Sequence, residues 1–115
     1  MELYFKVAID DDGGRVMGDG IRNLLTYAEE LGSLSAAARE MGMSYRQAWQ
    51  LVNDAERRLG TPLLLRQTGG LAGGGSRMTP EAQQLVERYD AFRSEAEALV
   101  RQVYDRYFTN RGDAP

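Results

Sequence analysis

Residues 33–59 constrain the fold more than any other part of the chain, because they have the pattern of two helices joined by a tight turn at Gly42. The second helix follows Ser44, begins with polar side chains and keeps its apolar side chains at helical spacing. Proteins use this arrangement to present one helix end to the major groove of DNA. The segment therefore predicts a DNA-binding protein and not an enzyme.

The composition narrows the remaining functions. The 115 residues are enough for one domain with an appended element, and a hydrophobic content of 43% allows an ordinary core. The chain has no cysteine and no histidine, which excludes disulfides, thiolate metal sites and hydrolases built on Ser-His-Asp or Cys-His. We also expect no membrane span, because no apolar run has membrane length, and no signal peptide, because the start lacks a basic region followed by an apolar stretch. We expect a cytoplasmic protein with no membrane association, cofactor, metal or small-molecule ligand.

The distribution of charge supports a DNA partner although the net charge is −3. Residues 39–79 contain six basic and three acidic side chains, whereas residues 1–38 contain three and seven, and residues 80–115 contain five and seven. The region of the two helices is therefore locally basic and lies between acidic flanks. The local field governs attraction to phosphate more than the total charge does.

The N-terminal residues 3–17 predict a β-hairpin. Leu3–Ile9 is rich in strand-forming residues, Asp10–Gly14 is a turn signal, and Arg15–Met17 can return as a short partner strand. The three consecutive aspartates also suggest a calcium loop, but the other ligands of such a loop, including its closing glutamate, are missing. A solvated turn is the favoured interpretation.

Apolar spacing and helix caps predict two helices before the Gly42 turn. Residues 20–31 repeat apolar side chains at helical spacing, with Asp19 as the expected N-cap and a glycine as the stop. Ser33 or Ser35 is expected to cap the second helix. Gly42 can adopt the positive φ that a sharp corner between helices needs.

The next helix has a clear start and a clear division of faces. Ser44 and Gln47 match a capping box, in which each side chain binds the backbone of the other. The predicted buried stripe consists of Ala48, Leu51, Val52, Ala55 and Leu59. Trp49 lies at the border of this stripe and is expected to pack against the neighbouring hairpin or the first helix.

The outward face of this helix is the predicted reading surface. Arginine can form paired hydrogen bonds with guanine, while glutamine and asparagine can do so with adenine. The candidate DNA contacts are Ser44, Tyr45, Arg46, Gln47, Gln50 and Asn53. The alternative is an ordinary solvated helix face, because the same residue types occur on any surface.

Residues 63–78 predict a wing, that is, a β-hairpin beside the reading helix. Leu63–Leu65 is a short apolar strand, a glycine-rich loop follows, and the chain returns near Met78. The loop lacks the Gly-Lys-Ser/Thr ending of a phosphate-binding P-loop. The candidate wing contacts are Arg66, Thr68, Ser76 and Arg77. The alternative is a plain mobile hairpin.

The last long segment, residues 80–108, predicts a dimerisation helix capped by Thr79. Its apolar side chains alternate at spacings of three and four, which forms a heptad seam. The seam comprises Ala82, Leu85, Tyr89, Phe92, Ala96, Leu99 and Val103. We expect a homodimer joined through this seam, with the tail 109–115 disordered. The alternative is that the first half packs within the molecule and the second half is solvated.

Four motifs resemble the N-terminal DNA-binding domain of ModE-type molybdate-responsive regulators, a LysR-like winged helix-turn-helix, over about residues 19–108. They are Gly-Ser-Leu-Ser-Ala-Ala-Ala at 32–38, Met-Gly-Met-Ser-Tyr-Arg-Gln-Ala-Trp at 41–49, the glycine clusters at 68–75 and Met-Thr-Pro at 78–80. The resemblance implies a dimer held by the long helix, with Tyr45 and Arg46 in the major groove. Molybdate-sensing members carry an oxyanion-binding region after this domain, whereas the sequence ends at Pro115. We therefore expect no molybdate binding by this chain.

Together these observations predict a mainly α fold with small β elements. A winged helix-turn-helix with an N-terminal hairpin would occupy residues 1–79, and the long helix would follow at 80–108. The expected function is that of a homodimeric, sequence-specific transcriptional regulator acting on a pseudo-palindromic site in double-stranded DNA. The alternative is a winged-helix module that binds other proteins and not DNA.

Overall fold

The computed structural model describes residues 1–67 and 75–109, and over these residues the protein is a mainly helical winged helix-turn-helix with small β-hairpins. The elements in chain order are β1 (Ile9–Asp11), β2 (Gly14–Met17), α1 (Asp19–Leu31), α2 (Leu34–Glu40), α3 (Tyr45–Leu59), β3 (Leu64–Gln67), β4 (Gly75–Met78) and α4 (Pro80–Phe108). The predicted fold class is therefore confirmed. The loop predicted at the wing tip and most of the tail lie outside the described residues.

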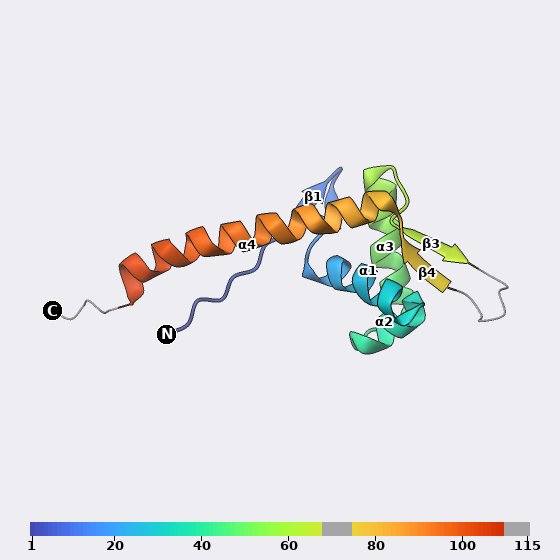
Figure 1. The fold of residues 1–115 in the computed structure, drawn as a ribbon, viewed down its shortest axis with the longest axis horizontal. Helices are drawn as coiled ribbons and strands as arrows, with labels where there is room; N and C mark the ends of the chain where they lie inside the picture. The colour runs from blue at the N-terminus through green and yellow to red at the C-terminus, as the bar shows by residue number, and fades with distance from the viewer. Residues whose placement is uncertain (68–74, 110–115) are drawn as a thin grey trace.

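One apolar core joins the short helices to both hairpins. α1 packs against α2 and β4, while α3 packs against α2 and β2. Figure 1 shows the wing β3–β4 on one side of this assembly and most of α4 extending away on the other side. The fully buried side chains include Met17, Leu24, Leu25, Val52, Leu63 and Tyr89. The core thus holds α3 and the wing in a fixed relationship.

Glycines and a serine set the corners of the helix-turn-helix. The Oγ of Ser33 accepts a hydrogen bond of 3.0 Å from the backbone N–H of Ala36, so Ser33, rather than Ser35, caps α2. Gly42 has a φ of 70° at the turn between α2 and α3, and Gly60 ends α3 with a φ of 74°. These left-handed conformations favour glycine, and the one at Gly42 confirms the prediction from the sequence.

The start of α1 differs from the prediction. Gly18 occupies the N-cap position and no side chain caps the helix, so the prediction of an Asp19 cap is wrong. The carboxylate of Asp19 instead accepts a hydrogen bond of 2.8 Å from the Tyr89 hydroxyl and lies 3.3 Å from the Arg93 guanidinium. The side chain of Asp19 therefore binds two residues of α4 that are distant in the sequence, and it does not cap α1.

The N-terminal hairpin is shorter than the predicted 3–17. Asp12 and Gly13 form the turn, both with positive φ, and pair Asp11 with Gly14 across it. The return strand ends at Met17 because α1 begins at Asp19, so among the described residues no partner strand remains for residues 3–8. This segment lies beside α4 instead, where Tyr89 donates a hydrogen bond of 3.0 Å to the carbonyl of Val7.

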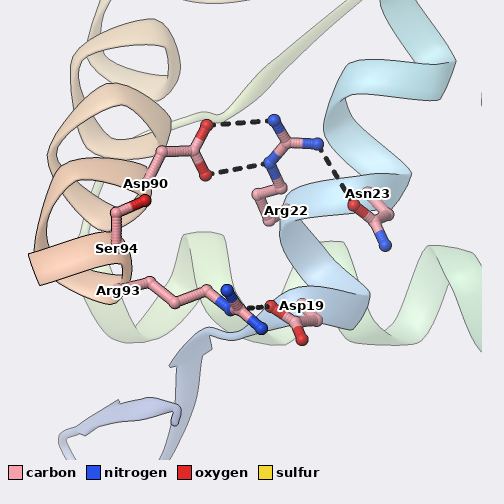
Figure 2. Close-up of a pocket in the computed structure, with 6 residues that line it drawn as sticks. All are labelled: Asp19, Arg22, Asn23, Asp90, Arg93 and Ser94. Carbon is pink, nitrogen blue, oxygen red and sulfur yellow. Dashed lines mark hydrogen bonds and ion pairs between the residues drawn. The ribbon is translucent and has the colours of Figure 1, made fainter. Parts of the chain in front are cut away.

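α4 is attached to the domain through its first half. Thr79 caps the helix by accepting a hydrogen bond of 3.0 Å from Ala82, as predicted. Farther along, Asp90 and Arg93 reach α1, where they form ion pairs with Arg22 and Asp19 (Figure 2). The second half extends beyond the domain and gives the molecule extents of 67 × 28 × 22 Å.

Candidate nucleic-acid interface

The first turn of α3 is fixed by a complete capping box. The Oγ of Ser44 accepts a hydrogen bond of 3.0 Å from the N–H of Gln47, and the Oε1 of Gln47 accepts one of 3.1 Å from the N–H of Ser44. The predicted capping box is therefore confirmed. Because both side-chain oxygens bind the backbone, these two residues hold the helix end in shape, and the adjacent side chains occupy the exposed surface.

Four side chains at this end of α3 surround one hollow. Tyr45, Arg46, Trp49 and Gln50 line a cavity of 360 Å³. Tyr45 is 51% exposed and Trp49 is 38% exposed. The expectation that Trp49 packs against the wing or α1 is therefore wrong, because the core closes over the smaller Ala48 and Val52 on the neighbouring face.

The apolar stripe of α3 is narrower than predicted. Ala48, Val52 and Ala55 are buried, whereas Leu59 is half-buried and Leu51 is exposed. Leu51 lies at the edge of the stripe, where the small alanines bring α3 close to its neighbours and leave the leucine outside. The prediction that Leu51 is buried is therefore wrong.

Farther along α3, polar residues bind one another. Asp54 accepts hydrogen bonds from Arg57 at 2.6 Å and from the amide of Gln50 at 3.0 Å. The Arg57 guanidinium is the main cause of a lowered pKa at Asp54. Gln50 therefore keeps its amide oxygen and one hydrogen for another partner, and Asn53 is half-buried beside a separate hollow that also borders Arg57.

The wing divides its side chains between two faces. In the β3–β4 register Leu64 pairs with Met78, Leu65 with Arg77, and Arg66 with Ser76. Ser76 is only 7% exposed, so the prediction that its side chain contacts DNA is wrong. It lies on the same face as the buried Leu64, because side chains alternate along a strand.

The two arginines of the wing have different surroundings. Arg66 lies 3.9 Å from the carboxylate of Glu56 on α3, whereas Arg77 is exposed on the other face of the hairpin. The described residues include no ion-pair partner for Arg77 or for Arg46 of α3. These two cations are therefore available to an external anion. Thr68, also a predicted contact, lies outside the described residues.

Glu56 connects α3 to the start of the wing. Its Oε2 accepts hydrogen bonds from the backbone N–H groups of Leu63 at 2.8 Å and Leu64 at 3.1 Å. No local sequence signal indicated this role, because the two amides follow the Gly60 stop and approach Glu56 only after the chain turns back. The helix and the first strand of the wing are thus joined by a charged hydrogen-bond acceptor.

The predicted dimerisation seam of α4 falls into two parts. Tyr89 is 1% exposed and Leu85 is half-buried, because this part of the helix packs on the domain. The prediction that Tyr89 contacts a partner is therefore wrong. Farther on, Phe92 is 48% exposed and Leu99 is 56% exposed, with Val103 also exposed and Ala96 half-buried between them.

Within residues 1–67 and 75–109, no cluster of three or more histidine, cysteine, aspartate or glutamate side chains has an arrangement that could hold a metal ion. Within the same residues, no helix is both long enough and apolar enough to span a membrane.

Comparison with known proteins identifies the family. The model of the family described as "bacterial regulatory helix-turn-helix protein, lysR family" matches residues 21–83, from α1 through the wing to the start of α4. The match covers more than half of the chain and includes every described element of the proposed interface. It confirms the predicted resemblance.

Curated relatives agree with the family match. The chain is 35% identical over 94 residues to the molybdenum-pterin-binding protein MopB of Rhodobacter capsulatus, covering 82% of this chain and 34% of MopB. It is 29% identical over 101 residues to the molybdenum transport protein ModE of Azotobacter vinelandii, covering 88% of this chain and 37% of that protein.

A third relative has a name that states a function. The DNA-binding transcriptional dual regulator ModE of Escherichia coli K12 is 37% identical over 68 residues, covering 59% of this chain and 26% of that protein. The chain thus spans between about a quarter and somewhat more than a third of the length of these relatives. It belongs to the lysR family of bacterial regulatory helix-turn-helix proteins, which are DNA-binding transcription regulators.

Proposed function

We propose that the protein is a sequence-specific transcriptional regulator that binds a pseudo-palindromic DNA site as a homodimer. The observation that carries this proposal is the exposed end of α3, where Arg46 has no ion-pair partner among the described residues and lies beside Tyr45 and Gln50. A helix N-terminus also favours a nearby phosphate. This end of α3 is the part that enters the major groove.

The side chains of α3 have separate roles in this proposal. Arg46 forms paired hydrogen bonds with a guanine, and Gln50 and Asn53 contact adenine edges. Ser44 and Gln47 fix the first turn of α3 through the capping box, and the fixed backbone of this turn positions Tyr45. Base contacts of this kind supply sequence preference, while contacts to phosphate supply general affinity.

The wing supplies contacts to the DNA backbone. Arg77 lies on the exposed face of the hairpin and binds a phosphate. Arg66 of β3 pairs with Glu56 of α3, which supports the wing, and adds positive charge near the duplex. Thr68, which lies outside the described residues, is proposed as a further contact from the sequence alone.

The homodimer is proposed from the second half of α4. This helix has 29 residues and a length of about 43 Å at the standard rise per residue. Leu99 and Val103 are exposed beyond the part that packs on the domain, and Phe92 is exposed on the same side of the helix, within that part. A second copy of the same helix can cover this apolar side and place two α3 helices on one face of the DNA.

The DNA-binding experiment begins with selection of bound fragments from random duplexes, followed by affinity measurements on the selected site. Arg46→Ala is expected to weaken specific binding by about 1–3 kcal/mol and to relax preference at one position of each half-site. Arg77→Ala is expected to weaken binding to all sequences and to reduce the salt dependence. Arg15→Ala removes the same charge from the N-terminal hairpin and serves as the matched control. Failure of the wild type to select any sequence would contradict the proposed function.

The dimer is tested by light scattering coupled to gel filtration. Leu99→Glu and Val103→Glu place a charge in the exposed seam and are expected to convert the dimer to a monomer. Ala98→Glu adds the same group on an exposed position outside the seam and is expected to leave the dimer intact. A monomeric wild type at micromolar concentration would contradict this part of the proposal.

The geometry of the site gives an independent test. Two α3 helices on one DNA face require half-sites about one helical turn, or 34 Å, apart or a multiple of it. Insertion of half a turn between the half-sites should therefore abolish the contribution of the second half-site. An affinity that does not depend on spacing would contradict simultaneous contact by two subunits.

A further inference from the structure

Trp49 and Tyr45 form an exposed aromatic pair on the helix that reads DNA. They are one helical turn apart on α3, and both line the same 360 Å³ hollow together with Arg46 and Gln50. Trp49 is the single tryptophan of the chain, and the core does not use it. Large aromatic side chains left partly in water commonly mark a surface that another molecule covers.

The chemistry of the hollow limits what can fill it. Its walls include two aromatic rings, while the Arg46 guanidinium and the Gln50 amide supply polar groups at the same place. In the major groove the 5-methyl of thymine is an apolar group displayed beside hydrogen-bonding base edges. The volume exceeds by many times the space of about 30 Å³ that one water takes in the liquid, so the edge of a base fits.

We propose that the hollow between Tyr45 and Trp49 receives the 5-methyl group of a thymine adjacent to the base that Arg46 contacts. This inference rests on the proposed DNA-binding function and adds a base preference to it. Trp49 is then a specificity-determining residue, because it removes the methyl group from water without using a hydrogen bond. The pair therefore distinguishes thymine from cytosine and from uracil at one position.

The charge around the hollow favours DNA over a protein partner. Arg46 borders it directly, and the N-terminal end of α3 carries the positive end of the helix dipole. Arg39 and Arg77 are also exposed in this basic part of the chain. A duplex satisfies these charges with phosphates at the same time as it fills the hollow with a base edge.

The test replaces each thymine of the selected site by deoxyuridine, one position at a time, which removes only the methyl group. Binding is measured by fluorescence anisotropy of labelled DNA at fixed salt. We expect one position per half-site at which the wild type loses affinity about three- to tenfold. Trp49→Ala should bind DNA with thymine and DNA with deoxyuridine at that position with the same affinity. Leu51→Ala, an exposed residue of α3 outside the hollow, should retain the full sensitivity.

The tryptophan supplies a second measurement. Because it is the sole tryptophan, its emission reports the hollow directly, and DNA containing thymine should change the emission more than DNA containing uracil at the sensitive position. Trp49→Phe keeps an aromatic side chain in the hollow and should keep part of the sensitivity to uracil. It provides the comparison if Trp49→Ala does not fold.

The outcomes separate this inference from the proposed function. If the wild type selects a site but binds it equally well with uracil at every position, the methyl contact is wrong and the DNA-binding function stands. If uracil weakens Trp49→Ala as much as the wild type, the methyl lies elsewhere. If the wild type selects no DNA, the proposed function fails, and the aromatic pair belongs to a protein-binding surface.

Discussion

Arg22 of α1 and Asp90 of α4, separated by 68 residues in the chain, face each other and share two hydrogen bonds. Nε of Arg22 donates to Oδ1 at 3.0 Å and Nη2 donates to Oδ2 at 2.9 Å (Figure 2). The contact with Asp90 is the main cause of a raised pKa at Arg22. The pair joins the helix-turn-helix to the long helix, beside a hollow of 420 Å³ that Asn23 and Ser94 also line.

We expect a double-mutant cycle of Arg22→Met and Asp90→Asn to give a coupling energy of about 0.5–1 kcal/mol, because the geometry is two-pronged although both side chains are partly exposed. The measurement is urea unfolding at low salt, and the coupling should fall in 1 M salt, where the Debye length is about 3 Å. The control is Arg15 with Asp10, whose single contact is 2.6 Å and whose side chains are 50% and 61% exposed. Equal coupling in the two pairs would contradict the importance of the two-pronged geometry.

Tyr89 should make stability depend on pH in the alkaline range. Burial raises its pKa to about 12, with a further contribution from the hydrogen bond to Asp19. In the unfolded chain the phenol titrates near its ordinary value of about 10. The unfolded state therefore loses its proton first, and the free energy of unfolding falls by about 2 kcal/mol as the pH rises from 10 to 12.

Tyr89→Phe is the variant that tests this dependence by urea unfolding between pH 8 and pH 12. At pH 8 we expect it to be less stable than the wild type by about 1 kcal/mol, because the hydroxyl no longer bonds to Val7 and Asp19. Toward pH 12 this difference should shrink and reverse. Tyr4→Phe changes an exposed hydroxyl and is the control. A difference that stays constant with pH would show that Tyr89 ionises normally.

The contribution of the α3 capping box to stability should be measurable in the absence of DNA. Ser44→Ala is expected to lower the free energy of unfolding by about 1 kcal/mol, while Ser44→Gly should lower it by only a few tenths. The reason is that the N–H of Gln47 loses its acceptor in both variants, but glycine exposes that group to water. Thermal unfolding followed by circular dichroism measures both. Equal losses in the two variants would contradict a capping role.

Among the acidic residues of α3, Glu56 should contribute most to the free energy of unfolding. Its carboxylate accepts hydrogen bonds from two backbone N–H groups and is largely covered. Glu56→Ala leaves both donors without an acceptor and should lower the free energy of unfolding by about 1–3 kcal/mol. Glu56→Gln keeps an acceptor and should cost less. Glu87→Ala, an exposed residue of α4, is the control and should have almost no effect. Hydrogen exchange at Leu63 and Leu64 should accelerate in the alanine variant, and unchanged exchange would contradict the assigned contact.

The features that sequence predicted well depend on neighbours a few residues away. The capping box needs only Ser44 and Gln47, and the turn at Gly42 needs only a residue that tolerates positive φ. All residues that produce such a signal lie within a few positions of one another in the sequence. The helix-turn-helix, and with it the family, could therefore be predicted without coordinates.

The features that sequence missed depend on residues that meet only in space. Asp19 has the character of a cap, but Tyr89 and Arg93 bind it from α4. Ser76 is a polar residue in a wing, yet the register of the strands turns it inward. Trp49 has the size of a core residue, but the alanine-rich face of α3 leaves no space for it.

The bond from Glu56 to the start of β3 has a consequence for the DNA as well as for the protein. Because Glu56 and the apolar core together hold α3 and the wing in a fixed relationship, neither can adjust alone to a wider or narrower groove in the proposed DNA complex. The duplex must supply the adjustment, and the energy of its deformation depends on the base steps between the contacted positions. In that proposed complex, base pairs that no side chain touches therefore also influence the affinity.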